Sequence, residues 1–219
     1  MIRVLLADDH PVVRSGYRRL LEQAGDIKIV GEAGDGHAAY ALFVALLNDA
    51  ADRPDVLVTD LSMPGCGGLE LMRRVLQRAP AARVLIFSMH DGALLVRRAF
   101  EGGARGFLTK ASAPDDLVIA IRALHAGQRY LGPDLPAELL QRDPGHEAER
   151  LAALSAREFE VFRLLAQGHS SAICADVLNL SPKTIANLQT VIKDKLGVAN
   201  SAALAHLALR HQVIGMAGP

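Results

Sequence analysis

The stretch DVLVTDLSMPG, residues 55–65, decides how the sequence folds. Its residues 56–59 form a short apolar and β-branched run bounded by proline and glycine, which is typical of a buried strand. Asp60 follows at the carboxyl end of that strand. In an open α/β sheet this end faces the crevice where ligands bind. Taken alone, Asp60 could simply cap the next turn through its side chain, so its role depends on the residues at the other strand ends.

The first 127 residues alternate strand-like and helix-like segments. The predicted strands cover residues 2–7, 27–33, 55–60, 83–88 and 106–109. The predicted helices cover residues 11–24, 37–49, 67–79, 91–102 and 114–126. Five β–α repeats predict a parallel sheet covered by helices on both faces. The expected fold class is therefore α/β, with a flavodoxin-like five-stranded parallel sheet.

Chemically useful side chains stand at the carboxyl ends of four of these strands. They are Asp8 and Asp9 after the first strand, Asp60 after the third, Ser88 at the end of the fourth and Lys110 after the fifth. Converging carboxylates repel one another unless a cation compensates them. Oxygen ligands suit a hard divalent ion, so the expected cofactor is Mg²⁺.

The same group of residues suits phosphoryl transfer. Asp60, flanked by a metal ion and the Lys110 ammonium, is a carboxylate nucleophile whose cationic neighbours can neutralise the oxygens of a transferring phosphoryl group. The Ser88 hydroxyl can donate a hydrogen bond to that group. Separately, Lys110 could be a surface lysine and Ser88 a strand-end cap, but the coincidence at successive strand ends favours the functional interpretation.

Four motifs then carry a family resemblance. ADDHPVVR, VTDLSMPGCGGLELMRRV, IFSMHD and GARGFLTKASAPDDL resemble the receiver domain of two-component response regulators, over residues 1–127. The resemblance implies that a sensor histidine kinase phosphorylates Asp60. It also implies that Asp9 binds Mg²⁺ directly, that Asp8 does so mainly through water, and that the backbone carbonyl of Ser62 completes the protein ligands.

The resemblance further identifies Ser88 and Phe107 as the switch pair of the family, although Phe107 is also compatible with a plain core residue. Two features depart from the commonest pattern. Ser62 stands where Asn is frequent, which could alter the lifetime of the phosphate, and the segment between residues 36 and 54 is longer than usual.

Residues 128–149 break the repeat and suit a linker with one short helix at 137–141. From residue 150 to 219 the sequence predicts a small all-α unit of four helices, at 156–167, 170–178, 182–196 and 201–212. Ser155 and Glu158 form a capping box at the first of them. A short helix, a tight turn and a longer helix make a helix-turn-helix.

The segment LSAREFEVFRLLAQGHSSAICADVLNLSPKTIANLQTVIKDKLGV resembles the LuxR-type DNA-binding domain. A receiver followed by this module is the layout of the NarL/FixJ family of response regulators. The resemblance implies that the third helix of the module enters the major groove of promoter DNA and that the fourth helps to form a homodimer on activation.

Helical periodicity separates two faces of the predicted third helix. Ile185, Leu188, Ile192 and Leu196 share the face expected to be buried. The residues expected to meet double-stranded DNA are Lys183, Thr184, Ala186, Asn187, Thr190 and Lys193. Asn187 suits pairing with adenine, and the two lysines suit phosphate contacts.

Charge around this helix is sparse for a DNA-binding unit. The family usually has Lys at the position of Ala186 and His at that of Leu188. From Arg150 onward the chain holds seven basic and four acidic residues, while the whole chain balances 24 against 24. Because phosphate neutralisation supplies much of the affinity for DNA, weak or altered DNA binding is a real alternative.

Composition points to a cytoplasmic protein without membrane segments. No signal peptide or long apolar run is visible, and Cys66 and Cys174 lie far apart without metal-ligand spacing, as reduced structural cysteines do. The expected function is a phosphorylation-switched transcription factor. The alternatives are a regulator whose C-terminal module binds protein, and a phosphatase using Asp60; Ser62 stands where such hydrolases carry a second Asp, so no enzyme is expected.

Overall fold

The computed structural model describes residues 1–136 and 145–214. These residues form two compact units. The first comprises residues 1–89 and 99–136, and the second comprises residues 90–98 and the C-terminal part of the chain. The division falls within helix α4 (Ala93–Glu101).

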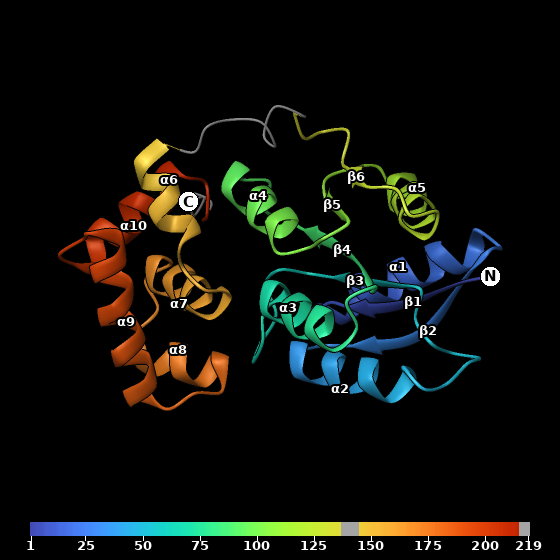
Figure 1. Ribbon diagram of the computed structural model, residues 1–219, viewed down its shortest axis with the longest axis horizontal. Coiled ribbons are helices and arrows are strands. Elements are labelled where there is room, and N and C mark those ends of the chain that lie inside the picture. Colours follow the sequence, from blue (N-terminus) through green and yellow to red (C-terminus); the bar gives the residue numbers. More distant parts are fainter. Residues whose placement is uncertain (137–144, 215–219) are drawn as a thin grey trace. The chain divides into compact units, whose positions relative to one another are not determined.

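The first unit is built on a parallel sheet with the strand order β2-β1-β3-β4-β5-β6 (Figure 1). The strands are β1 (Ile2–Ala7), β2 (Ile27–Ala33), β3 (Val56–Thr59), β4 (Arg83–Ser88), β5 (Gly106–Thr109) and β6 (Tyr130–Leu131). Every residue of β3 is buried, as its continuous apolar run predicts for a central strand. The predicted flavodoxin-like α/β architecture is confirmed.

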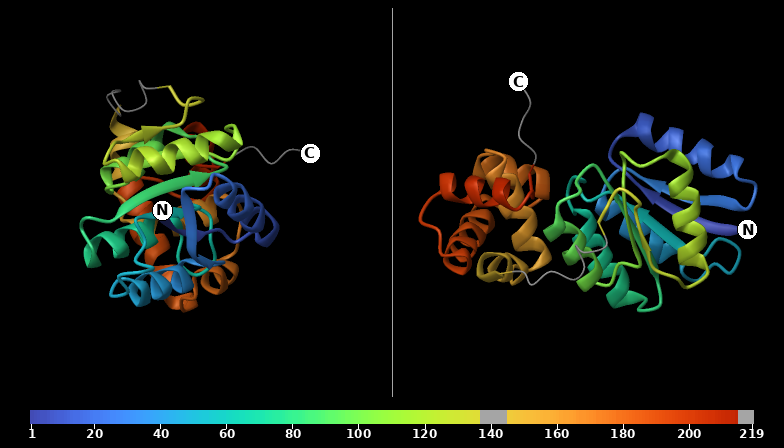
Figure 2. Two further views of the ribbon diagram at one scale, coloured as in Figure 1. Left: turned by 90° about the vertical axis from the view of Figure 1, so that its right-hand side faces the viewer. Right: turned by 90° about the horizontal axis from the view of Figure 1, so that it is seen from above.

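Helices cover both faces of this sheet, as the two further views show (Figure 2). The helices that belong wholly to this unit are α1 (Pro11–Gln23), α2 (Gly36–Leu46), α3 (Gly68–Arg78) and α5 (Pro114–His125). Leu21 of α1 and Leu117, Ile121 and Leu124 of α5 pack with the sheet side chains into one buried apolar cluster. The opposite face carries α2 and α3, which contact each other.

The sequence predicts five strands, and the sheet has a sixth, β6. β6 pairs with β5 in parallel through Gly106↔Tyr130 and Phe107↔Leu131. It has only two residues, and it lies in the interval 128–149 that the sequence predicts to be a linker. A strand this short has no alternation that a sequence pattern could reveal, because its identity depends on which distant segment it meets.

The second unit contains the helices α6 (Gly145–Ala152), α7 (Ala156–Ala166), α8 (Ser171–Leu178), α9 (Pro182–Leu196) and α10 (Ser201–Arg210). The last four match the predicted helices to within two residues. Asn179 ends α8 in the left-handed conformation, with φ of 53°, and Ser181 caps α9 through its side chain. α8, this turn and α9 together form the predicted helix-turn-helix. The short helix predicted at 137–141 lies outside the described residues.

The α7 N-terminus is tied to α9 through one carboxylate. Glu158 accepts a hydrogen bond from the Ser155 backbone N–H at 2.7 Å, and the Lys195 ammonium lies 2.9 and 2.7 Å from its two oxygens. Burial raises the pKa of Glu158, but its bonds from Lys195 and Ser155 lower that pKa more, so the net shift is downward. The predicted capping box therefore also acts as a link between two helices.

Both cysteines are buried and neither forms a disulfide; Cys66 follows β3 and Cys174 lies in α8. Burial raises the pKa of the Cys174 thiol. Over the part of the chain that the structure describes, no helix is long and apolar enough to cross a membrane.

Glu158→Gln is expected to lower the free energy of unfolding of the C-terminal unit by about 1–2 kcal/mol at pH 7, since it weakens both the cap and the link to α9. Because the folded pKa of Glu158 is depressed, its stabilisation is present above the unfolded pKa and lost as pH falls through the folded value. Urea unfolding at several pH values should show the gap to wild type closing as the pH falls below the ordinary pKa of a glutamate and through the lower folded pKa of Glu158.

Asp176→Asn is a suitable control, because Asp176 is exposed on the neighbouring helix α8. It should change stability by less than about 0.5 kcal/mol. Equal losses in the two variants, or a gap independent of pH, would contradict the role given to Glu158.

Candidate functional site

Sheet register brings two acidic residues together at the carboxyl edge. Ala7 of β1 and Thr59 of β3 are partners in the parallel ladder, so Asp8 and Asp60, which follow them, lie side by side. The Asp60 backbone N–H donates to the Ala7 carbonyl at 2.9 Å, which continues the ladder by one bond. Both side chains are almost fully buried, with 2% of Asp8 and 4% of Asp60 exposed.

Lys110 supplies the cation between these two carboxylates. Its Nζ lies 2.6 Å from Asp8 Oδ2 and 2.7 Å from Asp60 Oδ2. The Lys110 backbone N–H donates to the Ser88 carbonyl at 2.8 Å, which fixes the start of the turn after β5. Burial lowers the pKa of Lys110, but the bonds to Asp60 and Asp8 raise it more, so the ammonium stays charged. The sequence suggested a surface lysine as the alternative, and its burial rules that out.

A third carboxylate and an imidazole complete the acidic group. Ligand atoms of Asp8, Asp9, His10 and Asp60 all lie within 4.8 Å of one another. His10 Nδ1 lies 2.8 Å from Asp9 Oδ1, yet that buried oxygen accepts no hydrogen bond from the described residues. His10 was not among the predicted site residues, although it directly follows the acidic pair in the sequence.

This donor set fits a hard divalent cation. The three carboxylates outnumber the one lysine ammonium beside them, and one buried carboxylate oxygen accepts no hydrogen bond from the part of the chain that the structure describes. Mg²⁺ takes oxygen ligands in this way. A pocket of this kind is typical of receiver domains. The Ser62 backbone N–H donates to Asp60 Oδ1 at 3.3 Å, which places Ser62 next to the phosphoacceptor candidate.

The two predicted switch residues are buried in neighbouring strands. Ser88 ends β4 and Phe107 lies in β5, and neither side chain has any measurable exposure. Phe107 pairs with Ile86 in the ladder, while Ser88 pairs with Thr109, the residue before Lys110. Both residues are thus connected through the backbone to the turn that carries the lysine.

Gly68 permits the close approach of α3 to the end of β3. A Cβ atom at this position would lie 2.1 Å from the backbone carbonyl oxygen of Asp60, a distance that real Cβ contacts never show. The Gly68 N–H also donates to the Leu61 carbonyl at 3.0 Å. Gly68, the last glycine of the SMPGCGG run, therefore sets the position of Asp60, a role that the sequence alone did not reveal.

On α9, the predicted DNA-facing side chains are at the surface. Lys183, Thr184, Ala186, Asn187 and Thr190 are exposed, and Lys193 is half-buried. Ile185, Ile192 and Leu196 are buried as predicted, but Leu188 is only half-buried. Leu188 was wrongly placed in the buried stripe because it lies at the edge of that face, about 60° from its centre.

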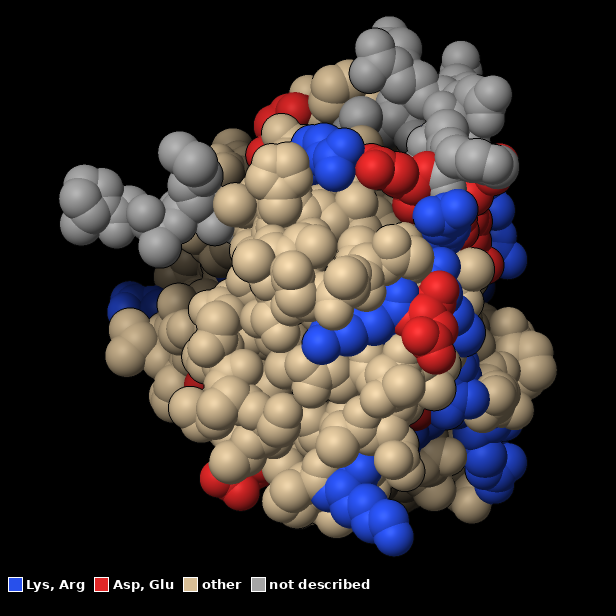
Figure 3. Space-filling model, turned by 90° about the vertical axis from the view of Figure 1, so that its left-hand side faces the viewer, with Lys and Arg blue, Asp and Glu red and all other residues tan. Residues whose placement is uncertain are grey.

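The face on which α9 and α10 lie carries little charge (Figure 3). Uncharged side chains fill most of this face, and most of the Lys and Arg side chains lie toward its right-hand side, several of them beside acidic side chains. Some of the basic residues of this unit are already paired, as Lys195 is with Glu158 and Arg210 with Glu147. The structure thus supports the charge-poor character that the sequence indicates.

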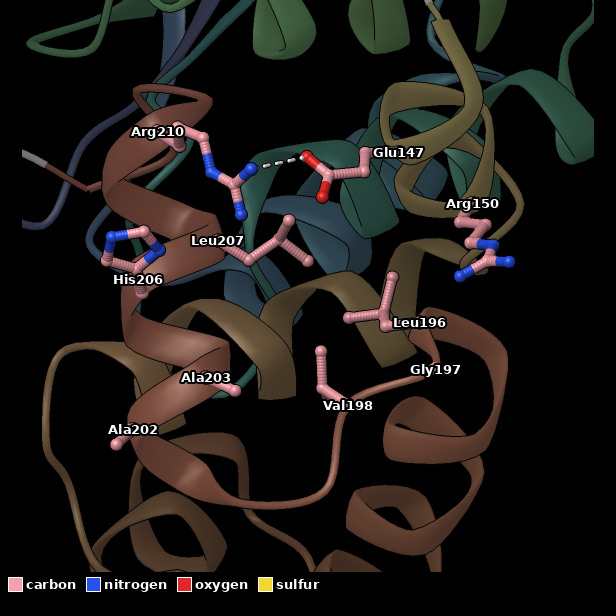
Figure 4. A pocket seen from close by; sticks show the side chains of 10 residues that line it. All are labelled: Glu147, Arg150, Leu196, Gly197, Val198, Ala202, Ala203, His206, Leu207 and Arg210. Atoms are coloured by element: carbon pink, nitrogen blue, oxygen red, sulfur yellow. Dashed lines mark ion pairs between the residues drawn. The ribbon is translucent and has the colours of Figure 1, made fainter.

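A pocket of about 500 Å³ lies between α6, α10 and the end of α9 (Figure 4). Leu196 and Leu207 line its apolar part, and Arg150 and His206 lie at its border. Arg210 and Glu147 form an ion pair across one side, at 3.1 Å. It adjoins α10 and not the outward face of α9.

Two family matches cover most of the chain. Residues 4–122 match the family described as response regulator receiver domain, and residues 152–208 match bacterial regulatory proteins of the luxR family. The chain belongs to the NarL/FixJ response regulators. Members of this family are DNA-binding transcriptional regulators, and phosphorylation of the receiver by a kinase is typical of them.

Relatives match this response regulator over its full length. The response regulator UvrY of Escherichia coli K12 is 36% identical over 213 residues, which is 96% of this chain and 95% of UvrY. The transcriptional activator protein ExaE of Pseudomonas putida is 39% identical over 217 residues, covering 98% and 99%.

A solved structure of a related response regulator has a similar fold. RcsB of Salmonella enterica serovar Typhimurium, bound to promoter rprA in the presence of the phosphomimetic BeF₃⁻, is 30% identical and has a TM-score of 0.66. The match covers 94% of this chain and 97% of RcsB.

Gly68→Ala is expected to destabilise the receiver by about 1–3 kcal/mol, because the added Cβ must displace the backbone that holds Asp60. Thermal unfolding measures this loss. Gly16→Ala is the matched control: Gly16 lies within α1 and a Cβ there meets nothing within 4 Å. Removing a helical glycine should stabilise by about 0.5–1 kcal/mol. A loss at Gly16, or none at Gly68, would contradict the packing argument.

Proposed function

We propose that this regulator is switched by a phosphoryl group on Asp60, received from a sensor histidine kinase in the cytoplasm. The observation that carries the proposal is the position of the Lys110 ammonium, 2.7 Å from one oxygen of Asp60, in a group of three carboxylates. A lysine held there can neutralise an oxygen of the incoming phosphoryl group. Residues 1–127 would form the receiver, 128–149 the linker and 150–219 the output domain.

The transfer exchanges one bond for another. An Asp60 carboxylate oxygen forms a bond to phosphorus while the bond from phosphorus to the kinase histidine nitrogen breaks, and that nitrogen keeps the electron pair. Asp60 becomes an acyl phosphate. Lys110 then pairs with a phosphoryl oxygen, and Ser88 donates a hydrogen bond to another.

Mg²⁺ would be held by Asp9 and Asp60, by Asp8 mainly through water, and by the Ser62 backbone carbonyl. Its contribution when bound is positive charge near the phosphoryl oxygens. The residues of this chain keep the remaining functions. Asp60 supplies the nucleophile, and Lys110 balances the charge that phosphorylation adds.

Binding of the phosphoryl group would shift the receiver between two conformations, with Ser88 and Phe107 as the moving pair. The free energy for this shift is the difference in how the two conformations hold the phosphoryl group. The output would be homodimerisation and binding of two-fold promoter DNA. The apolar surface at α10, where Leu209 is 40% exposed, suits contact with a second copy.

On DNA, α9 would enter the major groove. Asn187 would read a base edge, Lys183 and Lys193 would contact phosphates, and Thr184, Ala186 and Thr190 would line the same face. RcsB, a relative of similar fold, is bound to promoter DNA in its structure. Among the described residues neither Lys183 nor Lys193 has an acidic partner, so both charges are available to phosphate.

A second candidate is an output domain that acts mainly through protein contacts. Two observations favour it: the α9 surface is poor in charge, and apolar side chains are exposed on the helix-turn-helix. Ile173 of α8 is 46% exposed and Val191 of α9 is 39% exposed. Such side chains can bury apolar surface against a protein, but they add nothing to phosphate binding.

Asp60→Asn should abolish the gain of one phosphoryl group from a small phosphodonor with Mg²⁺, measured by intact mass, because the amide is not a nucleophile. Phosphorylated wild type should bind promoter DNA about 5- to 150-fold tighter than the unmodified chain, a usual size for such coupling. The Asn variant should not respond to the phosphodonor. Asp115→Asn, an exposed residue of α5, should behave as wild type. Phosphorylation of the Asn variant, or an unchanged DNA affinity of phosphorylated wild type, would overturn the proposal.

The salt dependence of DNA binding separates the two output functions. Lys183→Ala should reduce the slope of log K against log salt by about 0.9, the loss of one phosphate contact. Asn187→Ala should leave that slope unchanged and reduce discrimination between bases by about 1–3 kcal/mol. Selection from a random DNA pool, followed by titration at several salt concentrations, measures both.

The lysine control is Lys28→Ala, in β2 of the receiver, which should change neither quantity. If selection yields no preferred sequence with or without beryllofluoride, and Lys183→Ala has no effect, the protein-binding alternative is favoured.

A further inference from the structure

The segment that follows α5 is hydrogen-bonded to β5, the strand that contains the predicted switch residue Phe107. After α5 it forms β6, and the Gly132 N–H donates to the Phe107 carbonyl at 2.8 Å. Leu135 is buried, and its N–H donates to the Gly132 carbonyl at 3.0 Å. Residues 130–135 are therefore an ordered part of the receiver and not a free connection to the output domain.

Asp134 extends this attachment to the turn that carries Lys110. Its carboxylate accepts hydrogen bonds from the hydroxyl groups of Thr109 and Ser112, the latter at 2.7 Å. The two hydroxyl oxygens also lie 3.2 Å apart, which closes a ring of three polar side chains. Thr109 and Ser112 are the residues on either side of the Lys110–Ala111 pair. Both oxygens of Asp134 are thus used to hold this one turn.

Asp134 is exposed at the surface, and its carboxylate lies close to the backbone of Gly132. A Cβ on Gly132 would lie 2.8 Å from Asp134 Oδ1 and 3.2 Å from a methyl group of Leu108. Burial raises the pKa of Asp134, but the bonds from Thr109 and Ser112 lower that pKa more, so it is ionised at neutral pH. Hydrogen bonds to an ionised acceptor are about twice as strong as neutral ones.

Lys110 is therefore held from two directions. Its ammonium contacts Asp60 and Asp8 at the phosphoacceptor site, and its turn is fixed through Thr109 and Ser112 to Asp134. If the Lys110 ammonium moves and its turn moves with it, the hydrogen bonds from Thr109 and Ser112 to Asp134 must be strained or broken. The position of Lys110 and the attachment of residues 130–135 are therefore coupled, and such coupling acts in both directions.

We propose that Asp134 is a positioning residue that sets Lys110 for phosphorylation and, in return, makes the attachment of residues 130–135 depend on the state of Asp60. This inference rests on the proposed phosphorylation of Asp60. It assigns the start of the output signal to the segment directly after α5, through hydrogen bonds that lie within the receiver unit.

Phosphorylation rates of the full chain test the first half. Asp134→Asn keeps the shape but removes the charge, and it should slow phosphorylation by acetyl phosphate about three- to tenfold, the effect of a weakened charged hydrogen bond. Asp134→Glu should recover part of the rate. Asp115→Asn is the matched control, an exposed aspartate of α5, and should stay within about twofold of wild type.

Amide hydrogen exchange tests the second half, and a purely structural role would not produce this result. In wild type, beryllofluoride with Mg²⁺ should change the exchange of residues 130–135 by at least about threefold. In Asp134→Asn those amides should exchange fast in both conditions. If Asp134→Asn does not fold, Ser112→Ala takes its place, because it keeps the hydrogen bond from Thr109 to Asp134. It should also slow phosphorylation and speed amide exchange at residues 130–135.

The outcomes separate this inference from the proposed function. Two results would contradict the role proposed for Asp134 when wild type is phosphorylated on Asp60. One is a phosphorylation rate of Asp134→Asn equal to that of Asp115→Asn, and the other is amide exchange at residues 130–135 that does not change with beryllofluoride. If wild type takes no phosphoryl group at all, the proposed function is itself contradicted, and the inference is overturned with it.

Discussion

One buried ammonium holds the receiver site together. Asp8 and Asp60 are brought side by side by the register of β1 and β3, where their like charges would repel in a medium of low polarity. Lys110 lies within ion-pair distance of both. The ladder fixes the acids, the turn after β5 fixes the lysine, and the remaining negative charge suits a divalent cation. Charge balance and sheet geometry therefore depend on each other.

The two halves of the chain differ in how completely their polar groups are used. In the receiver, Asp60, Lys110 and Thr109 are buried and hydrogen-bonded, so their positions are closely defined. On α9 the predicted DNA-facing side chains include only two lysines, Lys183 and Lys193, and most of these side chains are exposed. Under the proposed function, a signal generated in a tightly constrained site would reach DNA through a surface that offers very few cations for phosphate contacts.

Much of the fold was predictable from local pattern. Strands at the centre of a parallel sheet are continuous apolar runs, and Ser155, Ser181 and Gly197 mark the helix ends of the C-terminal unit. The strand-end residues Asp8, Asp9, Asp60, Ser88 and Lys110 could be identified because topology alone places them at one edge. These features depend on neighbours along the chain or on the order of strands.

What the sequence did not reveal depends on contacts between distant segments. β6 exists only because Tyr130 and Leu131 meet the edge of β5, and Asp134 resembles any linker aspartate until its hydroxyl partners are known. The tight approach at Gly68 requires the position of the Asp60 carbonyl. Leu188 lies at the border of a helical face, where a shift of a few degrees decides between burial and exposure.

The burial of both native thiols has a practical consequence. Cys66 and Cys174 have no exposed surface, so a water-borne maleimide or spin-label reagent has no native target in the folded chain. A single cysteine introduced at a surface position would become the one reactive site without removal of either native residue. With one such cysteine in the receiver and a second on an output helix, the distance between two probes could be measured while both native cysteines are kept.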